Sequence, residues 1–435
     1  PHAVPEFETL VVPVNSTWVS LARERGVFEH DVLPGFLSRM RWYPERSAKQ
    51  IQPKLTSAVP FCDIGDNRPW LAFFEATQHG TSARYVMPMQ IEWVRFDRER
   101  FNPKALAAVR QGAREGTLLD VATDPIFIGL FLRNLSQSLI VEENDLRLDF
   151  KPTSRFAAYT VKQPEQIRAI EQANSTALVD NIYVTKIYRQ LEAGTNPEIE
   201  IGHYLPDVAR HANAPALLGT AELVEGNQRS AVGVVHAYVE NQGDGWAMTV
   251  GYLDRYIDEQ RLLPVSETPR EIQEQAPYLH YLAQTGKRLA ELHLALAAAD
   301  TADFMPEPID PAQIARWTGE LQARASRVCE LLAERRDGLR EPDRALIDRL
   351  LAARQSLANR LTGLLPSDIG GLNIRHHGDF RLGQVLIVKD DIFIIDFDGE
   401  AHRPIAERRR KLPAARDVAG LIRSIDLSVN AALSR

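Results

Sequence analysis

Between residues 376 and 400 the chain carries two aspartates and a side-chain amide at a spacing that could serve a metal-bound phosphate. Asp379 comes first, Gln384 follows five residues later, and Asp396 ends the next pair of apolar runs. Phosphoryl transfer from ATP needs a carboxylate that aligns the attacking hydroxyl and oxygen ligands that hold Mg²⁺ on the phosphates. The three side chains together therefore predict a site for phosphoryl transfer from ATP.

A β-hairpin is the element that must bring these groups together. The apolar runs 385–388 and 392–395 have the length and composition of strands, and Asp390 and Asp391 between them are typical of a turn. Protein kinases hold an aspartate base, a metal-binding amide and a metal-binding aspartate on a loop and hairpin of this kind. The His-Gly-Asp sequence around Asp379 alone would also fit a simple capped turn, so the prediction rests on all three groups.

Each group receives a chemical role. Asp379 is the candidate base, and a base of this kind contributes about 10²–10⁴-fold to the rate. Asp396, at the mouth of an apolar strand, is costly to bury unless it is paired or bound to metal, so it is the candidate Mg²⁺ ligand. Gln384 offers an amide oxygen to the same ion. Asp398 is either a further metal ligand or a group that supports the ligands.

A lysine on an earlier strand is the candidate partner of the phosphates. Lys186 lies in an apolar run, like the kinase lysine that neutralises the α- and β-phosphates and is held by a glutamate of the next helix. Glu198 and Glu200 both lie in the first turns of the helix that follows, and their spacing favours Glu200. The alternative is an exposed lysine on an edge strand, with acidic residues placed at a helix N-terminus for its dipole.

The remaining nucleotide contacts are expected from one loop and one segment between two lobes. No Gly-x-Gly-x-x-Gly pattern is present, but the loop 172–176 offers hydroxyl, amide and backbone N–H donors to a phosphate, although such residues fill any polar turn. The segment 234–242 is expected to bind adenine through its main chain. The residues assigned to these contacts are Asn174, Ser175, Thr176, Ala237 and Val239.

The composition excludes several classes of function. The net charge of −7 argues against a nucleic-acid partner, which normally requires a basic face. The longest apolar runs, such as 292–299, are too short to cross a bilayer, and no secretory signal is visible. Cys62 and Cys329 have no partner motif and indicate a reducing compartment, so we expect a cytoplasmic protein. The chain begins at Pro1 without a Met, which suggests a part of a longer polypeptide.

The order of patterns along the chain predicts an α+β protein with a bilobal, protein-kinase-like fold. Strand-like runs dominate the first half, and long helical patterns follow from residue 246. The middle of the chain shows strands, a helix and two more strands, the order of the small lobe of such a fold. We expect a lead-in at 1–28, a β-rich N-terminal cap at 29–102, an intermediate subdomain and N-terminal lobe at 103–240, and a mainly helical C-terminal lobe with the catalytic hairpin at 241–435.

Individual elements follow from the same patterns. A short amphipathic helix is expected at 29–41, and Asp124-Pro125 and Asn196-Pro197 are expected to open two more helices. The expected strands are 49–59, 70–77, 83–94, 155–161, 176–188, 216–224 and 230–239. The expected long helices are 246–259, 276–299, 311–335, 343–362 and 415–432. The basic run 408–411 is expected to be solvated, although it lies close enough to the hairpin to meet a phosphate or a sugar.

Several stretches together resemble the bacterial maltokinases, which are distant relatives of the aminoglycoside phosphotransferases. The resemblance covers most of the chain. It is carried by His377-Gly378-Asp379, Leu382-Gly383-Gln384, Ile395-Asp396-Phe397-Asp398-Gly399-Glu400, Arg403-Pro404, Glu407-Arg408-Arg409-Arg410 and Arg416-Asp417-Val418-Ala419-Gly420. It extends to Asn174-Ser175-Thr176, to Lys186, and to the segments 33–42, 191–200 and 241–246.

The resemblance implies ATP- and Mg²⁺-dependent transfer of a phosphoryl group to the anomeric hydroxyl of maltose. The product, maltose 1-phosphate, would feed α-glucan and glycogen synthesis from trehalose, with a trehalose synthase as the fused or associated partner. The Pro-rich lead-in 1–13 suits the junction of such a fusion. The residues then expected to contact the acceptor are His377, Arg381, Glu400, Arg403 and Trp246.

Two departures from the maltokinase pattern and two rival functions stay open. Asp398 stands where the family often has Glu, and family members usually continue beyond the helix around 416–424 with further helices that help to line the sugar site. One rival function is the phosphorylation of another small hydroxylated acceptor, such as another sugar or an aminoglycoside. The other is a kinase-like scaffold for a fused synthase, against which the intact Asp379, Gln384 and Asp396 argue.

Overall fold

The computed structural model describes residues 8–13, 25–45, 47–61, 69–78, 81–94, 102–143, 145–158, 162, 164–171, 174–262, 276–298, 301–364 and 370–434. The chain forms two compact units. The first comprises Pro1–Ala290, His377–Arg409 and Gly420–Arg435, and the second comprises Glu291–His376 and Arg410–Ala419. Both large sheets and the hairpin belong to the first unit. Within the described residues, no helix combines the length and the apolar character needed to cross a membrane.

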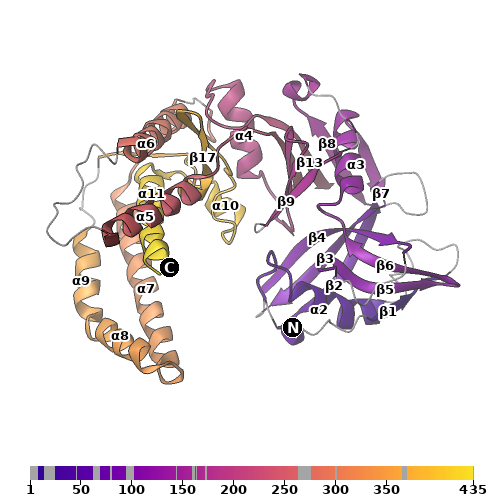
Figure 1. Ribbon diagram of the computed structural model, residues 1–435, viewed down its shortest axis with the longest axis horizontal. Coiled ribbons are helices and arrows are strands. Elements are labelled where there is room, and N and C mark those ends of the chain that lie inside the picture. The colour runs from indigo at the N-terminus through magenta and orange to yellow at the C-terminus, as the bar shows by residue number, and fades with distance from the viewer. Residues whose placement is uncertain are drawn as a thin grey trace. The chain divides into compact units, whose positions relative to one another are not determined.

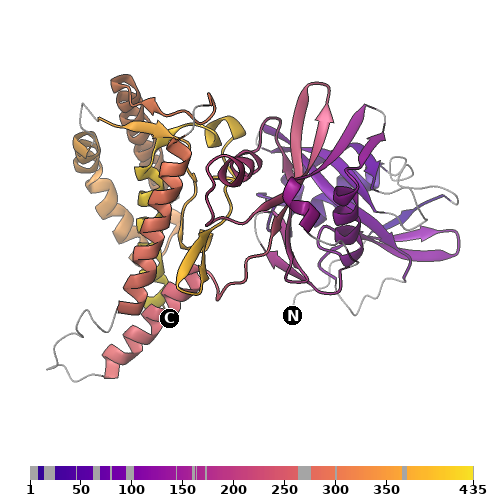
Figure 2. The same ribbon diagram turned by 90° about the horizontal axis from the view of Figure 1, so that it is seen from above.

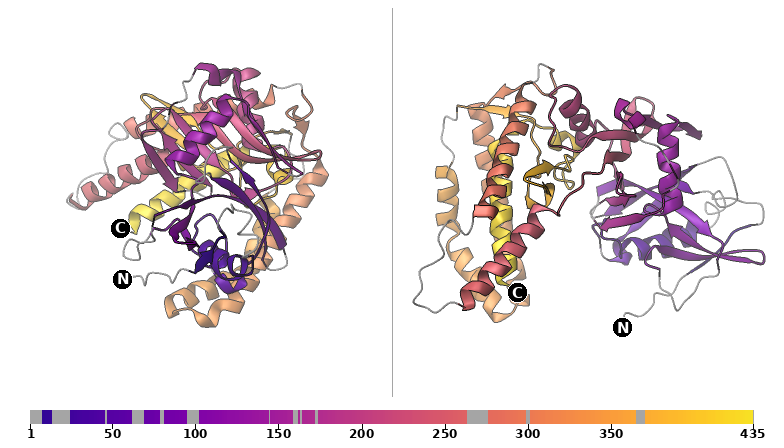
Figure 3. Two further views of the ribbon diagram at one scale, coloured as in Figure 1. Left: turned by 90° about the vertical axis from the view of Figure 1, so that its right-hand side faces the viewer. Right: turned by 45° about the horizontal axis from the view of Figure 1, so that its top comes forward.

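The first sheet has seven strands, β1 (Thr9–Val11), β2 (Gln52–Pro60), β3 (Trp70–Gln78), β4 (Thr81–Glu92), β5 (Ala105–Gln111), β6 (Arg114–Asp120) and β12 (Gln190–Leu191). Their order is β1-β5-β6-β4-β3-β2, with β12 paired to β4 (Figures 1 and 3). Exposed and buried side chains alternate along the first half of β2, as expected of a strand with one face on a core. Aromatic rings, including Phe36, Phe74 and Tyr85, fill that core.

The strands expected at 49–59, 70–77 and 83–94 are confirmed by β2, β3 and β4. The boundary expected at residue 102 is wrong, because β5 and β6 continue the sheet beyond β4. β1 joins the same sheet from within the expected lead-in. The helix expected at 29–41 begins and ends earlier and is irregular: it consists of α1 (Arg25–Val27), a π-helical turn (Phe28–Val32) and α2 (Leu33–Leu37).

The second sheet has seven strands, β7 (Ile140–Glu143), β8 (Leu146–Pro152), β9 (Ile167–Glu171), β10 (Ser175–Val179), β11 (Tyr183–Ile187), β13 (Leu217–Glu225) and β14 (Gln228–Ala237). They are antiparallel neighbours in the order β7-β8-β13-β14-β11-β10-β9. Helix α3 (Pro125–Ser136), capped by Asp124, packs on β8 and β13 (Figures 1 and 2). Gly219 permits this approach, because a Cβ there would lie 2.5 Å from the Leu135 side chain.

The second sheet confirms some expectations and corrects others. β13 and β14 confirm the strands expected at 216–224 and 230–239, and Asn196 caps α4 (Pro197–Asp207) as expected. The strand expected at 155–161 is wrong over its described part, which forms a 3₁₀ turn (Ser154–Ala158); residues 159–161 lie outside the described residues.

The strand expected at 176–188 is a hairpin of β10 and β11. Asp180 and Asn181 adopt φ values of 50° and 53° and so reverse the chain. Asp and Asn tolerate this left-handed conformation better than most residues do. The hairpin matters for the site, because it pairs Thr176 directly with Lys186.

Helices dominate the chain after the second sheet. In this part of the chain the first unit contains α5 (Gly245–Leu262), β17 (Val385–Val388), β18 (Asp391–Ile394) and α10 (Ile405–Arg408). The second unit contains the helices α7 (Pro311–Arg335), α8 (Glu341–Ala352) and α9 (Arg354–Leu364). It also contains a small sheet of β15 (Glu307–Pro308), β16 (Leu372–Ile374) and β19 (Leu412–Pro413). α6 (Ala276–Ala297) and α11 (Ala415–Leu433) have residues in both units. α5, α6, α7 and α11 confirm four expected helices, whereas the helix expected at 343–362 is broken at Ala353.

A buried arginine joins the two large sheets. Arg189 Nη2 lies 2.6 Å from Asp120 Oδ2, with the two side chains only 4% and 6% exposed. Arg189 Nε donates to the hydroxyl of Ser175 at 2.7 Å, and the guanidinium lies over the Trp42 ring at 4.7 Å. The main chain makes the same connection, since the N–H of Val86 donates to the carbonyl of Arg189. Arg189 therefore ties the first sheet to the strand β10.

Replacement of Arg189 by Ala should be strongly destabilising. The variant leaves the Asp120 carboxylate buried without its cation, and losing one partner of a buried pair costs about 3–5 kcal/mol in the free energy of unfolding. Urea denaturation followed by circular dichroism measures the change. Arg336→Ala removes an arginine from an exposed pair with Asp348 and is the matched control, since exposed pairs contribute little. Equal effects of the two substitutions would contradict the structural role of Arg189.

A second ion pair fastens the hairpin. Arg288 of α6 forms a forked pair with Asp391 at the start of β18, and its Nε lies 2.8 Å from Asp391 Oδ1. Asn213 Nδ2 donates to the Ile392 carbonyl at 2.9 Å and approaches Asp391 Oδ2 at 3.3 Å. The hydrogen bond from Arg288 is the main cause that lowers the pKa of Asp391 to about 2.

The lowered pKa of Asp391 predicts a contribution to stability that depends on pH. A depressed carboxylate pKa contributes stability above the unfolded-state pKa, near 3.9, and this contribution disappears as the pH falls through about 2. Asp391→Asn should therefore lower the melting temperature at pH 7, and its difference from the wild type should shrink below about pH 4. Thermal denaturation between neutral and acidic pH tests this. A difference that stays constant over that range would be incompatible with the prediction.

Candidate active site

The hairpin brings the predicted amide and the second aspartate into contact. Val385 of β17 pairs with Ile394 of β18, and at the base of this ribbon Gln384 Nε2 donates to Asp396 Oδ2 at 2.9 Å. Asp396 has a φ of 66°, in a region that non-glycine residues seldom occupy. Such a backbone persists only where the surrounding contacts hold it, and it is common at functional sites.

Asp379 lies in the loop before this hairpin. Its carboxylate is partly buried, and Arg381 Nε lies 3.3 Å from Asp379 Oδ2. Burial raises the pKa of Asp379 above its ordinary value, while the charge of Arg381 acts in the opposite direction. The carboxylate of Asp396 also raises this pKa, so Asp379 and Asp396 are close enough for their charges to interact. The contact between Gln384 and Asp396 agrees with the sequence prediction, and Asp379 lies in the loop that leads into the same hairpin.

His377 lies in the protein interior and does not make the contact with the acceptor that was expected for it. The residue is 1% exposed, and its ring lies between Phe380 and Phe397 at centroid distances of 5.3 and 5.1 Å. Nε2 donates to the carbonyl of Ile395 at 2.9 Å, and Nδ1 accepts from the N–H of Asp379 at 3.3 Å. Because both ring nitrogens are engaged in the interior, His377 positions the Asp379 loop against the hairpin.

Helix α11 supports the same loop from another side. Ser424 Oγ accepts a hydrogen bond from the N–H of Leu382 at 3.1 Å. Gly420 packs against the loop so closely that a Cβ would lie 2.6 Å from the Phe380 carbonyl oxygen. Packing therefore explains the glycine at position 420, which belongs to one of the motifs that carry the resemblance. Any side chain there would push away the loop that contains Phe380.

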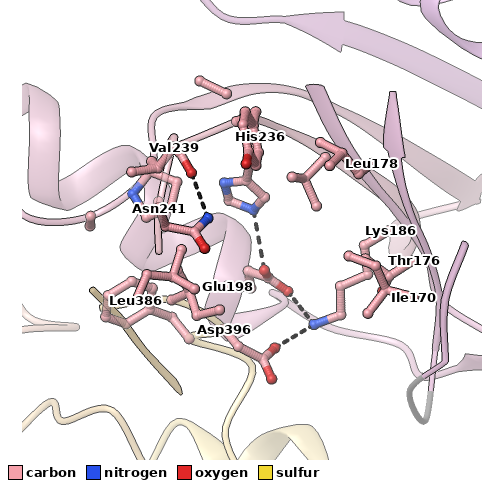
Figure 4. A pocket seen from close by; sticks show the side chains of 18 of the residues that line it. Ile170, Thr176, Leu178, Lys186, Glu198, His236, Val239, Asn241, Leu386 and Asp396 are labelled. Carbon is pink, nitrogen blue, oxygen red and sulfur yellow. Dashed lines mark hydrogen bonds and ion pairs between the residues drawn. The ribbon is translucent and has the colours of Figure 1, made fainter. Parts of the chain in front are cut away.

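Lys186 is buried between two carboxylates (Figure 4). Its Nζ lies 2.7 Å from Glu198 Oε2 and 2.7 Å from Asp396 Oδ1. Burial alone lowers the pKa of Lys186, but the carboxylates of Asp396, Glu198 and Asp398 outweigh that effect and raise it. Lys186 therefore remains a cation at neutral pH, as a partner of phosphates must.

Glu198, and not Glu200, is the helix carboxylate that holds Lys186, so the prediction from spacing is wrong. Glu198 also accepts from the Tyr188 hydroxyl at 2.5 Å and from His236 Nε2 at 3.2 Å. Burial raises the pKa of Glu198, but Lys186 and His236 lower it further, and the net shift is downward. Each helical residue advances about 100°, so Glu200 points to another side of α4, where it binds Arg409.

A cavity of about 410 Å³ lies beside the Lys186–Glu198 pair. Apolar side chains from the second sheet and the hairpin, including Leu178, Val184 and Leu386, give it walls suited to a flat heterocyclic ring. His236, Ala237, Tyr238 and Val239 form the edge where the strand β14 ends. Of the sequence-predicted residues, Thr176, Lys186, Ala237, Val239 and Asp396 line this cavity.

Two of the predicted phosphate donors do not line the cavity. Side chains alternate along a strand, so Thr176 faces the cavity whereas Ser175 faces the other side. The Ser175 hydroxyl accepts from Arg189 Nε, so the expected contact of its side chain with phosphate is not supported by the cavity lining. Asn174 is partly buried just before β10 and is not a lining residue. At the other edge, the N–H of Ala237 donates to the carbonyl of Ala216. At this residue adenine could therefore bond only to the Ala237 carbonyl.

Asp398 is held by cations and not oriented as an exposed metal ligand. It is 5% exposed, and its Oδ1 lies 2.5 Å from Arg408 Nη1 and 3.3 Å from Asn196 Nδ2. Burial raises the pKa of Asp398 to about 6 against the opposing charges of Lys186 and Arg408. The side chain of Arg408 is itself 5% exposed, so the expectation of a solvated basic run is wrong there.

The other predicted acceptor residues lie outside the cavity. Arg403 Nε binds Glu400 Oε2 at 2.6 Å, and its Nη1 lies 3.2 Å from Glu407. Trp246 is partly buried near the start of α5. Arg381 is 57% exposed, and its Nε lies 3.3 Å from the carboxylate of the candidate base Asp379.

The oxygen donors of the loop and hairpin fit a hard cation. Among the described residues, no group of three or more His, Cys, Asp or Glu side chains forms a ready cage for a metal. Mg²⁺ on a nucleotide does not need such a cage, because one or two protein ligands, the phosphates and water complete its shell. The Asp396 carboxylate and the adjacent Gln384 amide supply that number of ligands. The amide can present its oxygen after rotation, which the Asp396 contact does not prevent.

Several members of this network were not expected from the sequence. Tyr188 directly follows the end of β11, two residues after Lys186, and the two-residue spacing of an extended chain puts both side chains on one face, which is a signal that the sequence contains. His236 directly precedes the predicted adenine contact Ala237, but no local pattern marks it as a partner of Glu198. Glu192, which binds Arg408 at 2.9 Å, has no sequence signal.

The two sheets, the paired lysine and glutamate and the hairpin that brings Gln384 to Asp396 are consistent with a kinase-like α+β fold. The chain matches no protein-family profile. It is 28% identical over 259 residues to a glucosamine kinase of Streptacidiphilus jiangxiensis, an alignment that covers 59% of this chain and 53% of that protein. A glucosamine kinase of Mycolicibacterium smegmatis is 25% identical over 258 residues, with 59% and 57% covered. The aligned part thus spans just over half the length of these curated relatives.

Solved structures give the same result for the fold. A glucosamine kinase in complex with glucosamine, ADP and inorganic phosphate superposes with a TM-score of 0.57 at 20% identity, covering 88% of this chain and 75% of that chain. A second crystal form of a glucosamine kinase gives 0.57, with 94% and 80% covered. The kinase-like fold expected from the sequence is therefore supported, and the relatives are named for an amino sugar and not for maltose.

Proposed function

We propose that the chain is the catalytic part of an ATP- and Mg²⁺-dependent sugar kinase. The observation that carries the proposal is the continuous contact from Glu198 through Lys186 and Asp396 to Gln384 at the edge of a cavity of nucleotide size. This arrangement combines a phosphate-binding cation with oxygen ligands for a metal. A structural ion-pair network would not require the left-handed backbone of Asp396 or an adjacent apolar cavity.

Each side chain then has a defined task. Lys186, held by Glu198, would bind the α- and β-phosphates, and Asp396 and Gln384 would hold Mg²⁺, which would supply positive charge to the phosphates. Asp379 accepts a hydrogen bond from the acceptor hydroxyl, orients it in line with the phosphorus and takes its proton late. Thr176, paired with Lys186 in the sheet, is the remaining candidate donor to a phosphate from the predicted loop. Asp398 fixes the loop through Arg408.

Glucosamine is the first acceptor candidate, because both curated relatives reported above are glucosamine kinases. Maltose is the second, because the motifs around Asp379 and Asp396 resemble those of the maltokinases. With maltose as acceptor, the predicted product is maltose 1-phosphate. We then also propose that the protein associates with a trehalose synthase and that it is located in the cytoplasm. The site described here is common to both reactions, so the acceptor must be measured.

A screen of ADP release tests the proposal. The acceptors are glucosamine, N-acetylglucosamine, glucose, maltose, trehalose and an aminoglycoside, and binding of Mg·ATP is measured separately by calorimetry. We expect kcat/KM to be highest for glucosamine and to fall when its amine is acetylated. The highest value for maltose would establish the second candidate. Absence of both Mg·ATP binding and ADP release would refute the kinase assignment.

A further inference from the structure

Two arginines at the end of α10 reach the segment that carries α4. Arg409 forms a forked pair with Glu200, with Nε 3.0 Å from Oε2 and Nη2 2.7 Å from Oε1. The Glu200 side chain is 10% exposed and that of Arg409 is 28% exposed. Forked guanidinium–carboxylate pairs are both stronger and more directional than single contacts. The pair therefore fixes the orientation of α4 as well as its position.

Arg408 connects the metal-binding loop to the same segment. Its Nη1 binds Asp398 at 2.5 Å, and its Nη2 binds Glu192 at 2.9 Å. The second oxygen of Glu192 accepts from the N–H of Ile405 at 2.9 Å, so the start of α10 is fixed to the same carboxylate. Asp398 is also within 3.3 Å of Asn196, the residue that caps α4 through the N–H of Glu198.

Helix α4 is consequently held on two sides. On one side Glu198 contacts Lys186, Tyr188 and His236 of the second sheet. On the other side Glu200 contacts Arg409. α4 has only 11 residues and contains Pro206, so its own hydrogen bonds give it little rigidity. The Asn196 cap fixes the start of α4, and the contact to Arg409 is a further ionic contact of the helix that does not involve Lys186, Tyr188 or His236.

We propose that Arg409 and Glu200 form an ionic clamp that positions α4, and that Arg409 is thereby a positioning residue for the Lys186–Glu198 pair. The clamp rests on the proposed function, because it takes Mg·ATP as the ligand of the Lys186–Glu198 pair. It assigns a role to Glu200, which does not reach Lys186. It also links the metal-binding loop to the phosphate-binding lysine, because α10 follows that loop directly. In protein kinases, the position of the helix that carries the glutamate controls whether the same type of lysine–glutamate pair forms.

Arg409→Ala tests the clamp, with Arg410→Ala as the matched control. Both substitutions remove one positive charge at adjacent positions, and Arg410 is exposed. We expect Arg409→Ala to raise the Kd for Mg·ATP and the KM for ATP by about 5–20-fold and to leave the KM for the acceptor unchanged. Arg410→Ala should leave all three constants unchanged. The double variant Glu200→Arg with Arg409→Glu should recover most of the ATP affinity that either single substitution loses.

Hydrogen exchange separates the clamp from the proposed function. Arg409→Ala should speed exchange of the backbone amides of α4, and Arg410→Ala should not, whether or not ATP is bound. Circular dichroism and the melting temperature show whether both variants are folded. Unchanged exchange in α4, or unchanged ATP affinity in folded Arg409→Ala, would overturn the clamp. Failure of the wild type to bind Mg·ATP would refute the proposed function, and the exchange experiment would still decide the clamp.

Discussion

Replacement of Asp379 by Asn is expected to lower kcat by about 10²–10⁴-fold and to leave the Kd for Mg·ATP nearly unchanged. The amide keeps the size of the side chain and can still accept a hydrogen bond, but it cannot take the proton of the acceptor hydroxyl. Lys186, Asp396 and Gln384 should remain in place, because their hydrogen bonds join them to Glu198 and to one another and not to Asp379. Steady-state ADP release and calorimetric titration with Mg·ATP measure the two quantities.

Asp390→Asn provides the control for the Asp379 variant. Asp390 is an exposed residue of the nearby hairpin turn, so the same chemical change occurs without altering the site. The control should retain the wild-type kcat. A folded Asp379→Asn protein with turnover close to that of the wild type would show that Asp379 is not the base.

Replacement of Asp396 by Asn is expected to lower turnover by at least about 10²–10³-fold and to abolish the Mg²⁺ dependence of ATP binding. Asp396 carries the charge shared by Lys186 and Gln384, and an amide supplies one weaker oxygen and no charge. Lys186 keeps its contact with Glu198, so the fold should survive. Titrations of ATP in the presence of Mg²⁺ and of EDTA, together with circular dichroism, measure these effects.

Asp398→Asn distinguishes the metal site from the ion pair beside it. Because Asp398 binds the buried Arg408, its replacement should chiefly lower the melting temperature, whereas Asp396→Asn should chiefly affect the metal dependence. If instead Asp398→Asn removed the Mg²⁺ dependence and Asp396→Asn did not, the assignment of the metal ligand would pass to Asp398.

The catalytic hairpin could be predicted because its determinants are close in the sequence. Gln384 and Asp396 flank two short strands joined by a tight turn, so pairing of the strands alone brings them together. The same locality explains the helix starts at Asp124-Pro125 and Asn196-Pro197, where a capping side chain and a proline act on the next few residues. The turn at Asp180 and Asn181 also depends on neighbouring residues only. The sequence nevertheless predicted one continuous strand there, because the flanking residues favour strands.

The partners of buried charges could not be predicted in this way. Glu198 and Glu200 are both suitable carboxylates at the start of one helix, and only the rotation of α4 against the second sheet decides which one meets Lys186. Arg409 and Glu200 are separated by 209 positions, so their contact depends on the packing of distant elements. For the same reason the sequence placed His377 in the acceptor site, whereas packing between Phe380 and Phe397 buries it.

By itself, the sequence determined the kind of chemistry, because side-chain type and short-range spacing select the base, the metal ligands and the hairpin that carries them. The tertiary structure decided which faces of the helices and strands contact one another. The side of β10 that bears Thr176, the orientation of α4 and the burial of Arg408 all depend on contacts between segments far apart in the chain. A one-residue change of strand register, or a two-residue step around a helix, leaves the local pattern intact and reverses the direction of a side chain.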